Sequence, residues 1–224
     1  MNKYLLPVYA VLFGILIMVL YKQKKPFYHK VLLSFSGAFL LALTLFDLLP
    51  EVYGNLPTKQ MGVYIMCGIL IQIVLEFFSK GAEHGHVHIH QHENHFPWLL
   101  FISLCIHSMM EGFSINQHND MVYGIVVHKI PIAMVLTTLL LHSKCSKLQV
   151  VLSLGVFALM TPLGTFVSNN AIIGPNTVNI IKAFVVGIFF HISTTILFES
   201  SEGHKFDMSK LIAIILGVGI AYMI

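Results

Sequence analysis

The sequence of 224 residues carries little charge and no arginine. Only 10% of its residues are charged, against roughly 25% in soluble domains, and all 13 basic residues are lysine. Hydrophobic residues make up 56% of the chain, and the mean hydropathy is +0.81. Such a chain is too apolar to face water on all sides, which excludes an ordinary soluble protein. The net charge of +3, without a basic run, also argues against a nucleic-acid partner.

Cysteine is scarce as well. Cys67, Cys105 and Cys145 have no spacing typical of a metal or redox pair, so no disulfide framework is predicted. Histidine, by contrast, is abundant, with 13 residues. Because imidazole is a common metal ligand and a poor group for a lipid-facing surface, this abundance points to metal chemistry.

Long apolar runs occupy most of the chain. A membrane-spanning helix needs about 20 mostly apolar residues, and eight stretches qualify. They cover residues 4–21, 31–50, 61–79, 98–116, 121–141, 148–168, 177–198 and 207–224. The sequence therefore predicts an all-α integral membrane protein, a bundle of eight transmembrane helices. We expect one transmembrane domain over residues 1–224, because no soluble domain fits between the spans.

The lysines predict how the bundle is oriented. With the N-terminus outside and alternating spans, the inner ends carry Lys22, Lys24, Lys25, Lys30, Lys80, Lys144, Lys147, Lys205 and Lys210, and the outer ends carry Lys3, Lys59 and Lys182. This excess on one side follows the positive-inside rule. Both termini are then external, and the small size and short loops favour a bacterial inner membrane with periplasmic termini.

One dipeptide pattern occurs twice. Gly37-x-Phe39 in the second span recurs as Gly187-x-Phe189 in the seventh. The recurrence indicates an inverted repeat that relates the first three helices to the last three, around helices four and five.

A histidine-rich loop at about 80–97 lies on the predicted cytosolic side. Its alternating histidines include His84, His86, His88, His90 and His92. Histidine at this density is typical of metal-affine, low-complexity segments. Glu76 ends the third span just before the loop, so we expect Glu76 and these histidines to form a cytosolic exit or a regulatory site.

Three ionisable residues within the fourth and fifth spans predict a metal site. His107 and Glu111 are four residues apart, so they share one helical face. A short connection brings the fifth span back antiparallel, and its His128 then faces the pair. Two imidazoles and a carboxylate suit zinc, with a fourth position for water or another side chain.

Other polar residues extend this prediction. Asp47, Ser108 and His191 are candidates for additional ligands, and Asp47 and Glu51 together predict an acidic outer entrance. Lys129 cannot bind a cation, so it must pair with an acidic residue such as Glu111 or Asp47. Pro131 has no backbone N–H to donate, and its ring disturbs the preceding turn of the helix. Both effects free backbone carbonyls near His128.

Three segments resemble the ZIP family of metal-ion transporters. HSMMEGFSIN in the fourth span is similar to the family's His-Ser-x-x-Glu-Gly pattern, and HKIP in the fifth to its His-x-x-Pro or His-Lys variants. GAFLLALTLFDLLPE in the second span is similar to the family's Gly-x-Phe-Leu…Asp-Leu-Leu-Pro-Asp/Glu ending. The resemblance implies eight helices, external termini, import toward the cytosol and homodimers.

The resemblance also places residues at the site. It implies that His107, Glu111 and His128 form the primary transport site. Many relatives bind a second ion through an acidic residue just after the fifth-helix histidine and a glutamate four after it. This chain has Lys129 and Ile132 at those positions, so we expect a single ion.

Two other functions compete with transport of divalent metal ions. An intramembrane zinc hydrolase would activate water with the same three ligands, joined by His191 as an optional fourth. The sequence, however, has neither an HExxH motif nor a serine nucleophile elbow. A metal sensor that does not transport would need no polar path across the membrane. No resident cofactor is expected. Zn²⁺ is the preferred cargo, and Fe²⁺, Mn²⁺ and Cd²⁺ are alternatives.

Overall fold

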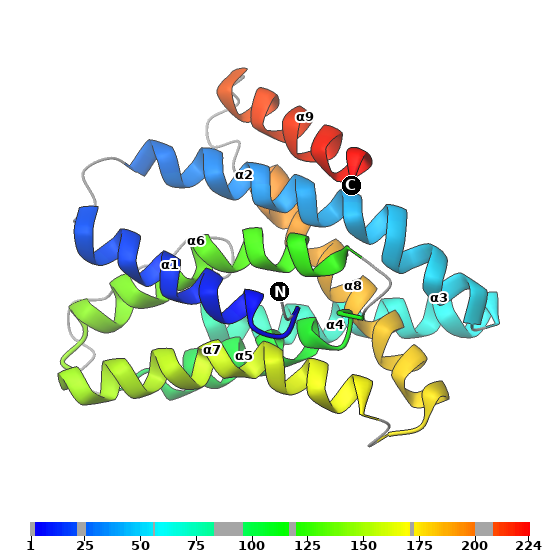
Figure 1. Cartoon of the computed structure of the whole chain (residues 1–224), viewed down its shortest axis with the longest axis horizontal. Coiled ribbons are helices and arrows are strands. Elements are labelled where there is room, and N and C mark those ends of the chain that lie inside the picture. The colour runs from blue at the N-terminus through cyan, green and yellow to red at the C-terminus, as the bar shows by residue number, and fades with distance from the viewer. Residues whose placement is uncertain are drawn as a thin grey trace.

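The computed structural model of the chain describes residues 3–21, 26–55, 57–82, 96–116, 120–170, 173–199 and 208–224. Within these ranges the chain forms helices joined by short connections, without a strand. Each of the eight predicted apolar stretches contains a helix (Figure 1). The prediction of an all-helical bundle with membrane-spanning character is thus confirmed.

The helices follow the apolar runs closely. In chain order they are α1 (Leu6–Tyr21), α2 (Pro26–Leu43), η1 (Thr44–Leu48), α3 (Leu49–Asn55), α4 (Thr58–Ser79), α5 (Trp98–Gly112), α6 (Met121–His142), α7 (Lys147–Asn169), α8 (Pro175–Glu199) and α9 (Met208–Met223). The second predicted span is made of α2, η1 and α3 in direct succession. The middle segment η1 is a π-helix, and Asp47 lies in it.

Five helical segments are long and apolar enough to cross a membrane by length and composition. They are Lys30–Asn55, Thr58–Ser79, Met121–His142, Lys147–Asn169 and Pro175–Phe198. The helices α1, α5 and α9 are apolar but shorter. Helix α5 ends at Gly112, earlier than predicted, because the following residues fold into a turn. In that turn the backbone N–H of Phe113 donates to the Met110 carbonyl, and the Ser114 hydroxyl donates to the Glu111 carbonyl.

The surface and the interior are inverted relative to a soluble protein. Large apolar side chains are strongly exposed, among them Phe77, Leu148 and Tyr222. In contrast, the interior buries charged groups completely, including Glu111 and Lys129. This distribution suits a bundle whose outer face contacts lipid and whose charged groups face the interior.

The buried apolar side chains form two clusters, and α6 takes part in both. Its first half contributes Met121 and Ile125 to a cluster shared with α2, α4, α8 and α9. Its second half contributes Leu136 to a cluster shared with α1, α5 and α7. His128 and Lys129 lie between these two halves. The polar residues of α6 are therefore at the boundary between the clusters.

Candidate metal site

Helix α5 brings three polar side chains to the same boundary. Its residues before the site, such as Leu104, pack in the cluster with α1 and α7, and Phe113 beyond the helix end packs in the other cluster. His107, Ser108 and Glu111 lie between them, and all three are buried. Because the residues before and after them pack in different clusters, these polar groups are held at the boundary between the two clusters.

His107, Glu111 and His128 converge on one point. One ligand atom from each lies within 4.8 Å of the other two. The Nε2 atom of His107 is 2.9 Å from the Oε1 atom of Glu111. The rings of His107 and His128 stand nearly perpendicular, with centroids 6.4 Å apart. Two neutral imidazoles and a carboxylate in this arrangement could hold a divalent transition metal, as in three-ligand zinc sites that keep an open position.

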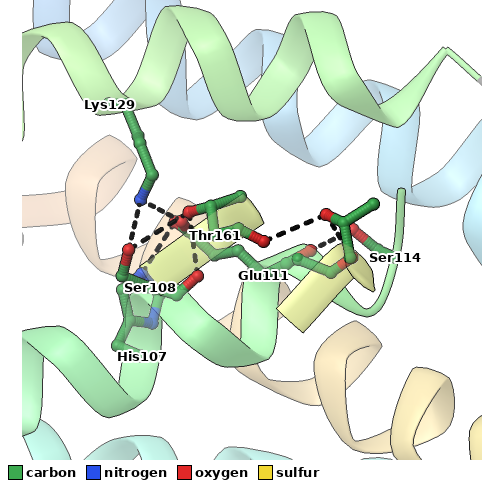
Figure 2. A network of polar contacts seen from close by, with 8 residues as sticks. His107, Ser108, Glu111, Ser114, Lys129 and Thr161 are labelled. Carbon is green, nitrogen blue, oxygen red and sulfur yellow. Dashed lines mark hydrogen bonds and ion pairs between the residues drawn. The ribbon is translucent and has the colours of Figure 1, made fainter. Parts of the chain in front are cut away.

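Lys129 reaches the same carboxylate from α6. Its Nζ atom is 2.6 Å from the Oε2 atom of Glu111, and it donates to the Ser108 hydroxyl over 2.8 Å (Figure 2). The lysine is fully buried, and its ammonium also lies 4.9 Å from the centre of the Phe157 ring. Of the two partners that the sequence offered, Glu111 and Asp47, the lysine thus takes Glu111. Ser108 contacts this lysine.

Helix α7 supports the site from behind, a role that the sequence analysis missed. Thr161 donates to the backbone carbonyl of Ser108 over 2.9 Å, and Thr165 donates to that of Gly112 over 3.0 Å. The two helices touch closely, because a Cβ atom at Gly112 would lie 2.2 Å from the Thr161 carbonyl oxygen. The sequence signal that could have predicted this packing of α7 against α5 is the run Thr161-Pro-Leu-Gly-Thr165, since small residues mark close helix contacts in membranes.

The proline of α6 lies inside a continuous helix. Pro131 has no backbone N–H, so the carbonyl of Val127 lacks its usual helical donor. This agrees with the expectation that the backbone near His128 is freed from part of its helical bonding.

The two acidic residues of the predicted entrance have different partners. Asp47 lies beside the backbone of Asp120, which immediately precedes α6. Glu51 lies 2.5 Å from the Nζ atom of Lys182 and accepts a hydrogen bond from Asn116 over 3.1 Å. The Glu51 carboxylate thus forms an ion pair with Lys182, which the sequence did not indicate. Neither residue belongs to the three-ligand group found among the described residues.

Glu76 and His191, predicted separately, form a pair. The Oε2 atom of Glu76 on α4 is 2.5 Å from the Nε2 atom of His191 on α8, and both side chains are partly exposed. In this structure His191 pairs with Glu76 and is not part of the three-ligand group around Glu111 that the described residues form. The loop histidines His84, His86, His88, His90 and His92 lie outside the described residues.

Comparison with known proteins agrees with the geometry. The model of a family described as ZIP Zinc transporter matches residues 79–224, which include all three converging residues and Lys129. The chain belongs to the ZIP zinc transporter family. It is 27% identical over 192 residues to Zinc transporter ZIP1 of Danio rerio, in an alignment that covers 61% of this chain and 64% of that protein.

Two further relatives have lower coverage of their own length. The chain is 30% identical over 151 residues to Zinc transporter ZIP1 of Takifugu rubripes, covering 62% of this chain and 50% of that protein. It is 25% identical over 166 residues to Protein zntD of Dictyostelium discoideum, covering 64% and 24%. The chain thus spans less than two thirds of the length of these relatives. With five apolar helices long enough to cross a bilayer, this ZIP-family chain is an integral, multi-pass membrane protein.

Proposed function

We propose that the chain carries a divalent transition-metal ion, preferably Zn²⁺, across a membrane through the group formed by His107, Glu111 and His128. The observation that carries this proposal is the convergence of three buried ligand atoms within 4.8 Å at the boundary of two apolar clusters. A buried carboxylate beside two buried imidazoles is costly in an apolar bundle, which favours a functional role for the group. The names of the zinc transporters ZIP1 that the chain resembles support the same cargo.

The chemistry of the site suits a cargo that binds and leaves. The two imidazole nitrogens and one carboxylate oxygen replace part of the hydration shell of the ion, and water completes its coordination. Histidine binds metal only when neutral, so protonation favours release. Fe²⁺, Mn²⁺ and Cd²⁺ are alternative cargoes, although imidazole ligands favour Zn²⁺ and Fe²⁺ over Mn²⁺. No enzymatic activity is proposed.

Polar residues on both sides of the central group support a route for the ion. Asp47 lies at the end of the second span that is predicted to be external, and its carboxylate attracts cations. The pair of Glu76 and His191 offers a carboxylate and an imidazole near the predicted cytosolic ends of α4 and α8. The histidine-rich loop follows α4 directly. We place the loop at the cytosolic exit, as an acceptor or regulator of the ion.

The finer architecture follows from the helix pattern and the lysine bias. All eight apolar helices cross the membrane, the three shorter ones included, and they form one transporter domain over residues 1–224. Both termini are external, in a bacterial inner membrane therefore periplasmic, and import runs toward the cytosol. The inverted repeat of the first three and last three helices, and assembly into homodimers, remain predictions.

Uptake of radioactive zinc by proteoliposomes containing the purified protein tests the proposal. The wild type should accumulate zinc, and His107→Ala should abolish accumulation because it removes a ligand from the site. His142→Ala is a matched control, since His142 lies on the exposed end of α6, where its ring is 2.8 Å from the Thr138 carbonyl. This control should transport normally.

The outcomes separate transport from its alternatives. Normal uptake by His107→Ala, with equal protein in the membrane, would contradict the assignment of the site. Zinc binding by the wild type without uptake would instead support a sensor. Metal-dependent hydrolysis without uptake would support an enzyme.

A further inference from the structure

Glu111 lies in the last turn of α5, where a helix is normally least firmly held. The last carbonyls of a helix have no helical donor, so the final turn tends to fray. Beyond Gly112 the chain leaves the helix, yet Phe113, Ser114 and Ile115 are buried. Figure 2 shows how the Ser114 hydroxyl donates to the Glu111 carbonyl. The other backbone groups of a buried, non-helical turn must also find donors within the bundle, and the placement of Glu111 depends on them.

Helix α7 supplies such donors from a single face. Four of its residues, at positions i, i+4, i+7 and i+8, donate to the end of α5 and to the turn beyond it. They form what we call the α7 ladder, and they are Thr161, Thr165, Ser168 and Asn169. The carbonyls that accept from them, in the same order, are those of Ser108, Gly112, Phe113 and Ile115. The ladder therefore joins α7 to α5 on both sides of Glu111.

The contacts of the α7 ladder are shortest where they surround Glu111. Those of Thr161 and Thr165 are 2.9 and 3.0 Å long, and both threonines are buried. The Thr165 hydroxyl is also 3.0 Å from the Thr161 carbonyl, so it shares its proton between the two helices. The contacts of Ser168 and Asn169 are 3.4 and 3.3 Å long, and Asn169 is exposed. The firmest part of the ladder is thus the part that brackets the metal ligand.

The backbones of α5 and α7 touch at the same place. A Cβ atom at Gly112 would lie 2.2 Å from the Thr161 carbonyl oxygen, and a Cβ atom at Gly164 would lie 2.0 Å from the Met109 carbonyl oxygen. Met109 and Gly112 stand on either side of Glu111 in the sequence. Because backbone atoms meet there, α5 has no room to shift toward α7, and the ladder opposes a shift away from it.

The braced segment carries two of the three metal ligands. The Nε2 atom of His107 and the Oε1 atom of Glu111 are 2.9 Å apart. Tetrahedral zinc, with ligands at about 2.0–2.1 Å, separates its ligand atoms by about 3.3 Å, so the pair has to open only slightly. Cd²⁺ has the same filled d shell but is larger, so it requires a wider separation of the same two atoms. The third ligand, His128, lies on α6, where Pro131 interrupts the helical bonding.

We propose that the α7 ladder positions Glu111 and thereby makes the site select Zn²⁺ over the larger Cd²⁺. The inference rests on the proposed function, because it assumes that His107, Glu111 and His128 bind the cargo. A braced α5 resists the separation of ligand atoms that the larger ion needs, whereas a loosened α5 accommodates both ions. The ladder residues are positioning residues, because they act on the ligands through the backbone of α5.

The ratio of the affinities for Zn²⁺ and Cd²⁺ tests the ladder. The purified full-length protein in detergent is titrated with each ion against a competing chelator, with the six histidines of residues 84–95 changed to Asn so that the loop does not contribute. Thr165→Val keeps the shape of the side chain but removes its hydroxyl, and the Gly112 carbonyl keeps the Ile115 N–H as a donor over 3.2 Å. The affinity for Zn²⁺ should fall about tenfold and that for Cd²⁺ less than about twofold, so the ratio should fall at least about fivefold.

Two further variants separate positioning from general stability. Thr165→Ser returns a hydroxyl to the same place, so the Zn²⁺ affinity and the ratio should both recover to wild-type values. Thr138→Val is the matched control, since the Thr138 hydroxyl donates over 2.7 Å to the Met134 carbonyl of its own helix. Both of its affinities should match the wild type. A merely structural role of Thr165 would weaken the binding of both ions equally and leave the ratio unchanged.

The failures of the two proposals differ. If the wild type binds neither ion in a way that His128→Ala abolishes, the proposed function fails. If the wild type prefers Cd²⁺, if Thr165→Val leaves the ratio unchanged, or if Thr165→Ser does not restore it, the function survives and the role of the ladder is overturned. Should Thr165→Val not fold, Ser168→Ala decides the question. Its ratio should fall about twofold, because the contact it removes is longer, at 3.4 Å, and an unchanged ratio would overturn the role of the ladder.

Discussion

Two lysines in the bundle each bind a glutamate, yet the two pairs have different surroundings. Lys129 and Glu111 are fully buried, and two histidines stand beside them. Lys182 and Glu51 lie near the predicted outer end of the bundle, where the glutamate side chain is 27% exposed and also accepts a hydrogen bond from Asn116. Each pair joins two helices, α5 with α6 in the first and α3 with α8 in the second, so both hold the bundle together.

The two pairs differ in whether the groups around the carboxylate can bind a metal ion. Around Glu51 the lysine and the Asn116 amide are both hydrogen-bond donors, and neither can ligate a metal. Around Glu111 the lysine takes one oxygen, and the other faces an imidazole, which can ligate a metal when it is neutral. A buried ion pair by itself is therefore a structural feature. The neighbouring imidazoles make the inner pair a candidate metal site.

The largest effect should come from neutralising each glutamate in turn. Glu111→Gln should lower zinc uptake by more than about 100-fold, since even the outer partners of metal ligands contribute about 10- to 100-fold. Glu51→Gln should leave uptake within about fivefold of the wild type, because a partly exposed pair is worth about 1 kcal/mol at most. Initial rates in proteoliposomes, scaled to the amount of inserted protein, measure both. Equal losses in the two variants would remove the distinction between the pairs.

A smaller effect should appear in stability, and it separates folding from function. Glu111→Gln leaves the ammonium of Lys129 buried without its counter-ion, which should cost about 3–5 kcal/mol of unfolding free energy. Adding Lys129→Met should restore most of that stability while uptake remains absent. The corresponding changes Glu51→Gln and Lys182→Met should each cost only about 1 kcal/mol. Denaturant titration of the metal-free protein in detergent measures these values.

An inner pair that behaved like the outer one would contradict this comparison. The decisive observation is recovery of stability without recovery of uptake in the double variant. If uptake returned together with stability, Glu111 would matter only for folding.

Much of the architecture could be predicted because lipid imposes simple rules. Each apolar run of sufficient length became a helix, since backbone polar groups in a bilayer must be satisfied within the segment. The grouping of His107, Glu111 and His128 was also predictable, because a spacing of four fixes one face of α5 and the short connection to α6 leaves few arrangements. The helix ends were less accurate. α5 stops at Gly112, where the Ser114 side chain closes a turn that apolarity cannot signal.

Contacts between distant segments could not be predicted. Lys182 and Glu51 are 131 positions apart, and no local pattern indicates that they meet. The same holds for the pairing of Glu76 with His191 and for the support that Thr161 gives to Ser108. Each depends on how helices pack side by side, which is set by close contacts at residues such as Gly112 and Gly164. Composition and periodicity predict how many helices form far better than they predict which helices pack against each other.

The smallest effect should distinguish the neutral residues that support the two pairs. Thr161→Val keeps the shape of the side chain but removes the hydroxyl that holds Ser108, so unfolding free energy should fall by about 1 kcal/mol. Asn116→Leu removes the amide beside Glu51 and should cost a similar amount. Only Thr161→Val should also change transport. It should lower zinc uptake by about fivefold, because Ser108 and Lys129 would hold the carboxylate less firmly by about 1 kcal/mol. Uptake that responded equally to both substitutions would show that the inner network transmits no more to the metal ligands than the outer one does.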